Sequence, residues 1–252
     1  MLDLKDKSVI VTGGGSGIGR AAALLFGNAG ANVTVADLNA DNAAETVSML
    51  KKAGGDAQFT HTNIREEDHV KAMVHTAVSR YGKLDAAANC AGVPSHSKML
   101  HELTLEQWER VVHTNLTAAF LCLKYEIPAM LAAQGGSIVV VSSTVGIKAQ
   151  PLHSEYAASK AGVLGLVRSA AQEYGKRGIR VNAVLPGPTL TPMSQGSVDA
   201  NPGIEAIVSA QLFLGRWAHP NELASAIGWL LSDASSFVTG ICIPVDGGQT
   251  AG

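Results

Sequence analysis

The sequence has little that would place it in an oxidising compartment or a membrane. Its three cysteines, Cys90, Cys122 and Cys242, show neither a paired pattern nor metal-ligand spacing, so we expect reduced thiols and no metal site. No run approaches the roughly 18 apolar residues of a membrane-spanning helix. The first residues carry charges where a signal peptide needs an apolar core. These absences predict a soluble cytoplasmic protein without a membrane partner.

Charge is also scarce. Charged residues make up 16% of the 252 residues and the net charge is -2, which leaves no basic patch for a nucleic acid. Hydrophobic residues reach 46%, enough for a large core and for contacts between subunits. The chain contains no linker, internal repeat or low-complexity tract. We therefore expect one domain over residues 1–252.

Short apolar runs rich in β-branched residues alternate with helical patterns along the chain. Strands are expected at 8–12, 32–37, 58–62, 84–89, 137–142, 180–185 and 241–245. Helices are expected at 20–30, 40–53, 66–81, 104–133 with an interruption or bend near Pro128, 156–174, 203–214 and 221–231. An irregular stretch is expected from the sixth strand to about 201. Apolar strands separated by helices predict the α/β class, with a Rossmann-type, doubly wound parallel sheet covered by helices on both faces.

A glycine-rich turn follows the first expected strand and opens the first helix. Residues 12–19 read Thr-Gly-Gly-Gly-Ser-Gly-Ile-Gly. In this context glycines let the backbone approach a pyrophosphate, and the free N–H groups of the helix start face its charge. The candidate contacts are Gly13, Ser16, Gly17, Ile18 and Gly19.

The second expected strand ends at Asp37, 18 residues after Gly19. A carboxylate there can accept hydrogen bonds from the adenosine ribose hydroxyls of a dinucleotide. The same carboxylate repels a 2′-phosphate, and neither Ser16 nor Leu38 supplies a cation to offset it. The pair Asp37 and Leu38 therefore favours NAD over NADP as the cofactor.

An acid/base pair is expected on the helix at 156–174. Tyr156 and Lys160 are four residues apart, so they share one helix face. Moving a tyrosine pKa from about 10 to about 7 requires roughly 4 kcal/mol of preferential stabilisation of the phenolate. A fixed cation in a site shielded from water supplies much of that. At this spacing alone, a half-buried tyrosine and a solvated lysine is the commoner arrangement.

The remaining motifs make the chain recognisable. They are Asn89-Cys-Ala-Gly92, Asn115, Ser143, Tyr156-Ala-Ala-Ser-Lys160, and Pro186-Gly187 with Thr191. Together with the glycine-rich turn, and in this order, they resemble the short-chain dehydrogenase/reductase family over the whole chain, in its members of about 250 residues with one Rossmann-type domain.

The resemblance implies catalytic roles for four residues. Tyr156 is expected to be the general acid/base, and Lys160 to hold the nicotinamide ribose and stabilise the phenolate. Ser143 is expected to orient the substrate oxygen, rather than Ser142, which should face the other side of the strand. Asn115 is expected to anchor a water that connects Lys160 to solvent. Without the resemblance, Asn115 reads as a helix asparagine satisfied by a neighbouring carbonyl.

The resemblance also implies further contacts to the cofactor. These are Asn63, Ile64, Asn89, Ala91, Gly92, Tyr156, Lys160, Pro186, Gly187, Thr189 and Thr191. The sequence departs from the family where Asn63 replaces a more usual aspartate, although its carbonyl accepts the same bond. Cys90 replaces a usual asparagine, which puts a sheet-stabilising hydrogen bond in doubt.

The substrate pocket is expected between the loops 93–98 and 144–153 and the segment at about 189–214, which the resemblance implies is a lid. Ile147, Leu152, Met193 and Phe213 make it apolar, and no arginine cluster is there to fix a carboxylate or phosphate. We therefore hypothesise a small or medium neutral secondary alcohol or ketone, cyclic in form, as the substrate of an NAD-dependent oxidoreductase.

Two alternatives remain open at the level of sequence. A 3-oxoacyl-thioester reductase on the acyl carrier protein fits the same motifs, although such biosynthetic enzymes usually use NADP. A non-catalytic NAD-sensing protein fits the fold, but has no need for an acid/base set. The resemblance further implies a homotetramer, with the helices at 104–133 and 156–174 in one interface and the last strand in another.

Overall fold

The computed structural model describes residues 2–252, apart from the side chains of residues 197 and 200. It contains one seven-stranded sheet in the order β3-β2-β1-β4-β5-β6-β7, and every neighbouring pair is parallel. The strands are β1 (Ser8–Thr12), β2 (Asn32–Asp37), β3 (Ala57–His61), β4 (Ala86–Asn89), β5 (Gly136–Val141), β6 (Ile179–Pro186) and β7 (Cys242–Val245). All seven expected strands are confirmed, with ends that differ by one or two residues.

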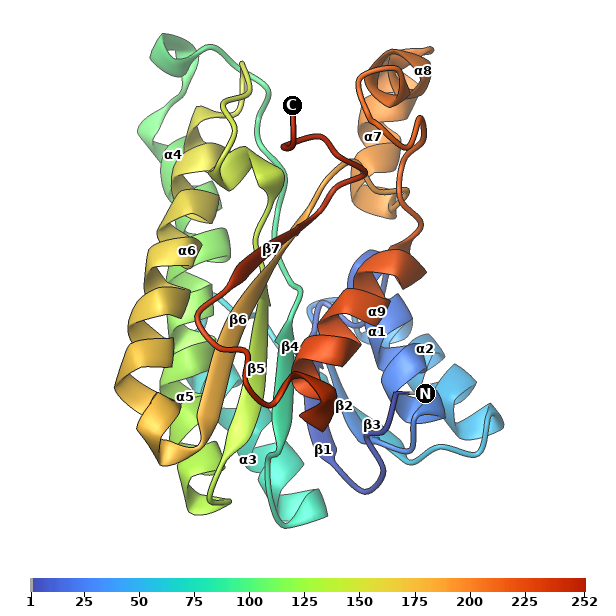
Figure 1. Cartoon of the computed structure of the whole chain (residues 1–252), viewed down its shortest axis with the longest axis vertical. Helices are drawn as coiled ribbons and strands as arrows, with labels where there is room; N and C mark the ends of the chain where they lie inside the picture. Colours follow the sequence, from blue (N-terminus) through green and yellow to red (C-terminus); the bar gives the residue numbers. More distant parts are fainter. Residues whose placement is uncertain (1) are drawn as a thin grey trace.

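Helices cover both faces of the sheet (Figure 1). The α-helices are α1 (Gly17–Asn28), α2 (Ala40–Lys52), α3 (Glu67–Tyr81), α4 (Leu105–Val112), α5 (Ala118–Ala132), α6 (Ser154–Tyr174), α7 (Pro192–Ala200), α8 (Ile204–Ser209) and α9 (Pro220–Leu231). Helices α1, α2 and α9 bury their apolar residues on one face, and α3, α5 and α6 on the other. The doubly wound α/β sheet expected from the sequence is confirmed.

Two sequence expectations about helices are wrong. Pro128 lies inside α5 and does not interrupt it. The helical conformation continues from α4 into α5 through a π-helical turn, His113–Thr117, where the Asn115 side chain bonds to a neighbouring loop. The stretch up to 201 is not irregular, because it contains α7. Thr191 begins this helix by accepting a hydrogen bond from the Ser194 N–H, and Pro192 occupies the first helical position.

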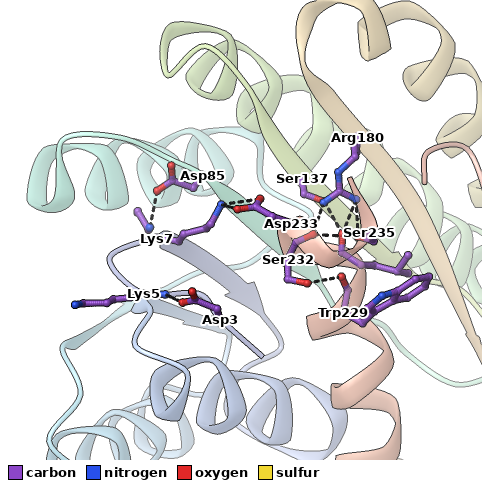
Figure 2. Close-up of polar contacts among 12 residues, drawn as sticks. Asp3, Lys5, Lys7, Asp85, Ser137, Arg180, Trp229, Ser232, Asp233 and Ser235 are labelled. Carbon is purple, nitrogen blue, oxygen red and sulfur yellow. Dashed lines mark hydrogen bonds and ion pairs between the residues drawn. The ribbon is translucent and has the colours of Figure 1, made fainter. Parts of the chain in front are cut away.

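At the amino end of β6 a partly buried arginine links the sheet to the last helix, α9 (Figure 2). The Arg180 guanidinium donates to the Leu230 and Ser232 carbonyls and to the Ser235 hydroxyl, at 2.7 to 2.9 Å. Ser137 of β5 donates to the same Leu230 carbonyl at 2.9 Å. These bonds satisfy the carbonyls at the end of α9, which lack helical partners.

The strand order reverses between β1 and β4, since β2 and β3 continue on one side and β5, β6 and β7 on the other. In open α/β sheets this reversal opens a crevice outside the carboxyl ends of the strands. Figure 1 shows α7 and α8 standing beyond that edge, apart from the helices that cover the sheet. None of the described helices is long and apolar enough to cross a membrane.

Candidate active site

The turn between β1 and α1 has the shape that a phosphate-binding loop needs. Gly13 and Gly17 adopt positive φ angles of 67° and 51°, which favour glycine. A Cβ on Gly13 would lie 2.9 Å from the Ala91 Cα, and one on Gly19 would lie 2.2 Å from the Gly13 carbonyl oxygen. Ser16 caps α1 without a side-chain hydrogen bond, and no acidic residue stands in the first turn. The positive end of α1 is therefore open to an anion.

Asp37 lies beside this turn. Its carboxylate accepts hydrogen bonds from the Gly15 and Asn39 N–H groups, both at 2.8 Å. The neighbouring cation of α1, Arg20, forms an ion pair with Glu45 at 2.6 Å. Leu38 is well exposed beside it. A negative charge is thus fixed at the end of β2, and the nearby arginine is already paired.

The segment after β6 covers the open end of α1. Gly187 passes so close to β7 that a Cβ would lie 2.7 Å from the Asp246 Cα. Beyond it, a Cβ on Gly17 would lie 3.4 Å from the Thr191 Cβ, so the two segments are in contact. Thr189 is held in place by its hydroxyl, which donates to the Gly187 carbonyl at 2.9 Å. Pro186, Gly187, Thr189 and Thr191 therefore lie where they can enclose a dinucleotide bound at the glycine-rich turn.

The expected contacts on β3 and β4 are also near the crevice. The Asn63 side-chain oxygen accepts a hydrogen bond from the Arg65 N–H at 3.2 Å, and Ile64 packs against the core. The Thr12 hydroxyl accepts hydrogen bonds from the Cys90 and Ala91 N–H groups, at 3.1 and 3.3 Å. This threonine, which the sequence analysis did not single out, ties the ends of β1 and β4 together despite Cys90.

Lys160 is buried and close to Tyr156. Its Nζ donates to the Val141 carbonyl at 2.9 Å and lies 5.6 Å from the centroid of the Tyr156 ring. Burial lowers the pKa of Lys160 to about 8. At pH 7 the side chain therefore still carries a positive charge on the face that Tyr156 shares.

The pKa of Tyr156 shifts in the direction opposite to the one expected. Burial raises it above its ordinary value, and a hydrogen bond with Ser143 opposes that rise. The cause is the loss of water around the phenol, which disfavours the charged form more than the hydrogen bond with Ser143 favours it. The contact with Ser143 supports the choice of that serine, because the Ser142 hydroxyl points to α6 and donates to the Lys160 carbonyl at 2.9 Å.

Asn115 links the π-helical turn to the segment that follows β4. Its side-chain oxygen accepts from the Val93 N–H at 2.8 Å, and its amide donates to the Val93 carbonyl at 3.0 Å. A Cβ on Gly92 would lie 3.0 Å from the Asn115 oxygen and 3.7 Å from the Lys160 Nζ. Gly92 therefore lies between Asn115 and Lys160, and the four expected catalytic residues gather at one place.

Two buried carboxylates beside this site were missed by sequence reasoning. Glu126 of α5 accepts a hydrogen bond from the Asn89 amide at 2.9 Å, and burial raises its pKa to about 7. Glu155, next to Tyr156, accepts from the His96 N–H at 2.7 Å. Both are fully buried. A glutamate at an apolar position of a helix was the available signal for Glu126.

A loop of glycines at a helix start, a carboxylate at the end of β2 and a partly buried tyrosine beside a buried lysine define an oxidoreductase that binds a nicotinamide dinucleotide. Comparison with known proteins supports this class. The family model described as "Enoyl-(Acyl carrier protein) reductase" matches residues 13–250. The chain belongs to the short-chain dehydrogenase/reductase family, as its motifs indicated.

Individual relatives agree. The 2,5-dichloro-2,5-cyclohexadiene-1,4-diol dehydrogenase of Sphingobium indicum is 46% identical over 252 residues, which is 100% of both chains. The cyclohexanol dehydrogenase of an Acinetobacter species is 40% identical over 250 residues, covering 98% of this chain and 96% of the relative. The crystal structure of carveol dehydrogenase from Mycobacterium avium in complex with NAD has a TM-score of 0.96 at 29% identity and covers 100% of both chains. The expected oxidoreductase activity on CH–OH groups is thereby confirmed.

Proposed function

We propose that this protein is an NAD-dependent dehydrogenase of neutral, cyclic secondary alcohols. The observation that carries the proposal is the buried Lys160 beside Tyr156, with Ser143 hydrogen-bonded to the phenol. A phenol, a fixed cation and a hydroxyl in one crevice can take the proton of an alcohol while a hydride leaves its carbon. The relatives named for cyclohexanol and for a cyclohexadiene diol support the ring-shaped substrate.

The residues present fit a nicotinamide dinucleotide. The glycine-rich turn would hold the pyrophosphate, Asp37 the adenosine ribose, and Lys160 the second ribose. When bound, the cofactor supplies the hydride acceptor. Asp37, with Arg20 paired elsewhere, supports NAD over NADP because a 2′-phosphate would meet a carboxylate.

In the proposed reaction, the chain's own residues position the alcohol and move its proton. Ser143 and the Tyr156 oxygen bind the alcohol hydroxyl, and the Tyr156 phenolate accepts its proton. Lys160 stabilises the phenolate through its charge, and Asn115 fixes the loop that leaves β4. In the reverse direction, Tyr156 donates the proton to the carbonyl oxygen.

Apolar side chains at the edge of the crevice support a neutral substrate. Ile147, Leu152, Met193 and Phe213 are all well exposed, on the loop before α6, on α7 and on the segment after α8. A ring that covers them would remove apolar surface from water at about 25 cal/mol per Å². The segment 189–214, with α7 and α8, is the proposed lid.

The test is the initial rate with cyclohexanol and cyclohexanone, with NAD(H) and NADP(H) in parallel, for the wild type and Tyr156→Phe. We expect turnover with NAD that falls at least about 100-fold in the variant, whose NAD binding is retained. A preference for NADPH and acyl-thioesters would support the thioester reductase instead. NAD binding without turnover of any alcohol would support the sensing protein.

We also propose a homotetramer in the cytoplasm. Leu105 and Phe120, on α4 and α5, and Phe237, before β7, are large apolar side chains left well exposed. A Cβ on Gly165 of α6 would meet nothing within 4 Å, which leaves room for a neighbouring helix. Gly162, by contrast, packs on Leu116 of the same chain. Light scattering after size-exclusion chromatography measures the mass of the assembly.

A further inference from the structure

The segment that leaves β4 passes the catalytic helix without forming a helix or strand of its own. Residues 90–99 lie between β4 and the short helix Leu100–Glu102. They begin at the strand reversal, where Gly92 lies between Asn115 and Lys160. The loop 93–98 is therefore one wall of the crevice that holds the proposed acid/base.

One carboxylate from the catalytic helix holds this wall. Glu155 Oε1 accepts a hydrogen bond from the His96 N–H at 2.7 Å, and the His96 Nδ1 lies 3.3 Å from the same oxygen. Glu155 is fully buried, in the first turn of α6, where the helix dipole favours a negative charge. Its other oxygen is buried without a hydrogen-bond partner in the described residues. Within the described residues, the Glu155 carboxylate therefore has His96 as its hydrogen-bond partner.

The contact continues to α4 through the imidazole. Arg110 lies 3.4 Å from the His96 Nε2. A guanidinium has only donors, so Nε2 is the acceptor and the ring proton sits on Nδ1, facing Glu155. Arg110, His96 and Glu155 form one chain of donors and acceptors from α4 to α6 across the loop.

The loop backbone is strained beside this contact. Ser97 has a φ of 54°, in the left-handed region that residues other than glycine rarely adopt. Such a conformation costs energy and persists where neighbouring contacts determine it. The two hydrogen bonds of Glu155 to the preceding residue provide those contacts, together with those of Asn115 to Val93.

We infer that Glu155 is a positioning residue that fixes the loop 93–98 against the catalytic helix and so sets the shape of the alcohol site. The inference rests on the proposed function for its link to substrate, but the contact itself does not. Because Glu155 precedes Tyr156 directly, the wall and the acid/base are held by one helical turn. Glu155 is expected to act on alcohol binding more than on the cofactor, because the loop 93–98 that it holds contains none of the proposed cofactor contacts.

The test compares Glu155→Ala, Glu155→Gln and the matched control Glu173→Ala, which alters an exposed glutamate of the same helix. Hydrogen exchange followed by mass spectrometry reports on residues 93–98, and kinetics with cyclohexanol and NAD report on the site. In Glu155→Ala we expect the hydrogen-exchange rate of these amides to rise about 10- to 100-fold, because a hydrogen bond to a charged group is lost. We expect the KM for the alcohol to rise about tenfold, more than kcat falls, with NAD affinity unchanged.

Glu155→Gln keeps an acceptor for the His96 N–H and should restore most of the hydrogen-exchange protection and most of the KM. This recovery would separate loss of the acceptor from a general disturbance of the fold. Wild-type exchange and KM in a folded Glu155→Ala would overturn the inference. If circular dichroism shows that Glu155→Ala does not fold, the Glu155→Gln variant is the test. We expect the hydrogen-exchange rate of residues 93–98 in this variant to rise about threefold to tenfold, because its bond to the His96 N–H is uncharged. No rise would overturn the inference. If the wild type turns over no alcohol, the proposed function fails, while the exchange of residues 93–98 still decides the contact.

Discussion

The buried Glu126 should make the stability of the protein fall as pH rises toward neutrality. Burial raises its folded-state pKa to about 7, against an ordinary 4.5. Below pH 4.5 both the folded and the unfolded chain carry the Glu126 proton, so the ionisation of Glu126 does not yet lower the stability. Between pH 4.5 and 7 the unfolded chain loses the proton first and the folded state loses stability. Above pH 7 both are ionised and the loss is complete.

The size of this effect follows from the two pKa values. At 1.36 kcal/mol for each pH unit between 4.5 and about 7, the folded state loses about 3 kcal/mol in total. The hydrogen-bond pattern agrees with a protonated acid. The Asn89 amide donates to Glu126 Oε2, while Glu126 Oε1 and Asn89 Oδ1 are both buried acceptors without partners in the described residues. A protonated carboxyl adds a donor to this group of buried acceptors, which an ionised carboxylate lacks.

Glu126→Gln isolates this contribution because its carboxamide provides both an acceptor and a permanent donor. Urea unfolding at pH 5, 6, 7 and 8, at one protein concentration, gives the free energy of unfolding for each protein. We expect the wild type to lose roughly 2–3 kcal/mol relative to the variant between pH 5 and 8, because part of the total loss already occurs below pH 5. Glu173→Gln, an exposed control, should give a difference that does not change with pH. A pH-independent difference for Glu126→Gln would refute the reasoning.

Two further predictions concern the cofactor. Asp37→Ala should lower the ratio of kcat/KM for NAD to that for NADP by about tenfold or more, because the charge that faces a 2′-phosphate is removed; a wild type that already prefers NADP would contradict this. Gly13→Ala should lower stability by about 1–3 kcal/mol and weaken NAD binding, since its Cβ would press on the Ala91 backbone at a positive φ. Gly54→Ala is the matched control, with a φ of 86° and nothing within 4 Å; calorimetric binding and thermal unfolding should show an effect on NAD affinity in Gly13→Ala alone.

The features predictable from sequence are those set by local sterics and periodicity. Glycines at 13, 17 and 19 and the apolar strands made the sheet, the turn and the family evident. The start of α7 had a local signal in Thr191 and Pro192. No local signal gave the direction of the Tyr156 pKa shift. Spacing shows that Lys160 shares its helix face, but it does not show how little water reaches the phenol.

Contacts between distant segments lay beyond sequence reasoning. The hydrogen bond of Glu126 spans 37 residues, and that of Glu155 to the His96 N–H spans 59. No periodicity identifies such a partner, because the pairing depends on how α5 and α6 are placed against the β4 exit. The π-helical turn at His113–Thr117 was also beyond sequence reasoning. It places Asn115 against Val93, and no proline in the sequence marks it.

The contacts to the segment that follows β4 have one common cause. Residues 90–99 have no ladder or helix to take up their N–H groups, and buried backbone donors must find acceptors elsewhere. Side chains supply them: Thr12 for Cys90 and Ala91, Asn115 for Val93, Glu155 for His96 and Glu102 for Met99. All five bonds reach the loop from residues outside it, and four of them come from residues distant in the sequence. Under the proposed function, the wall of the alcohol site is therefore shaped by residues that need never touch the alcohol, and we expect its specificity to depend on them as well as on the apolar side chains at its edge.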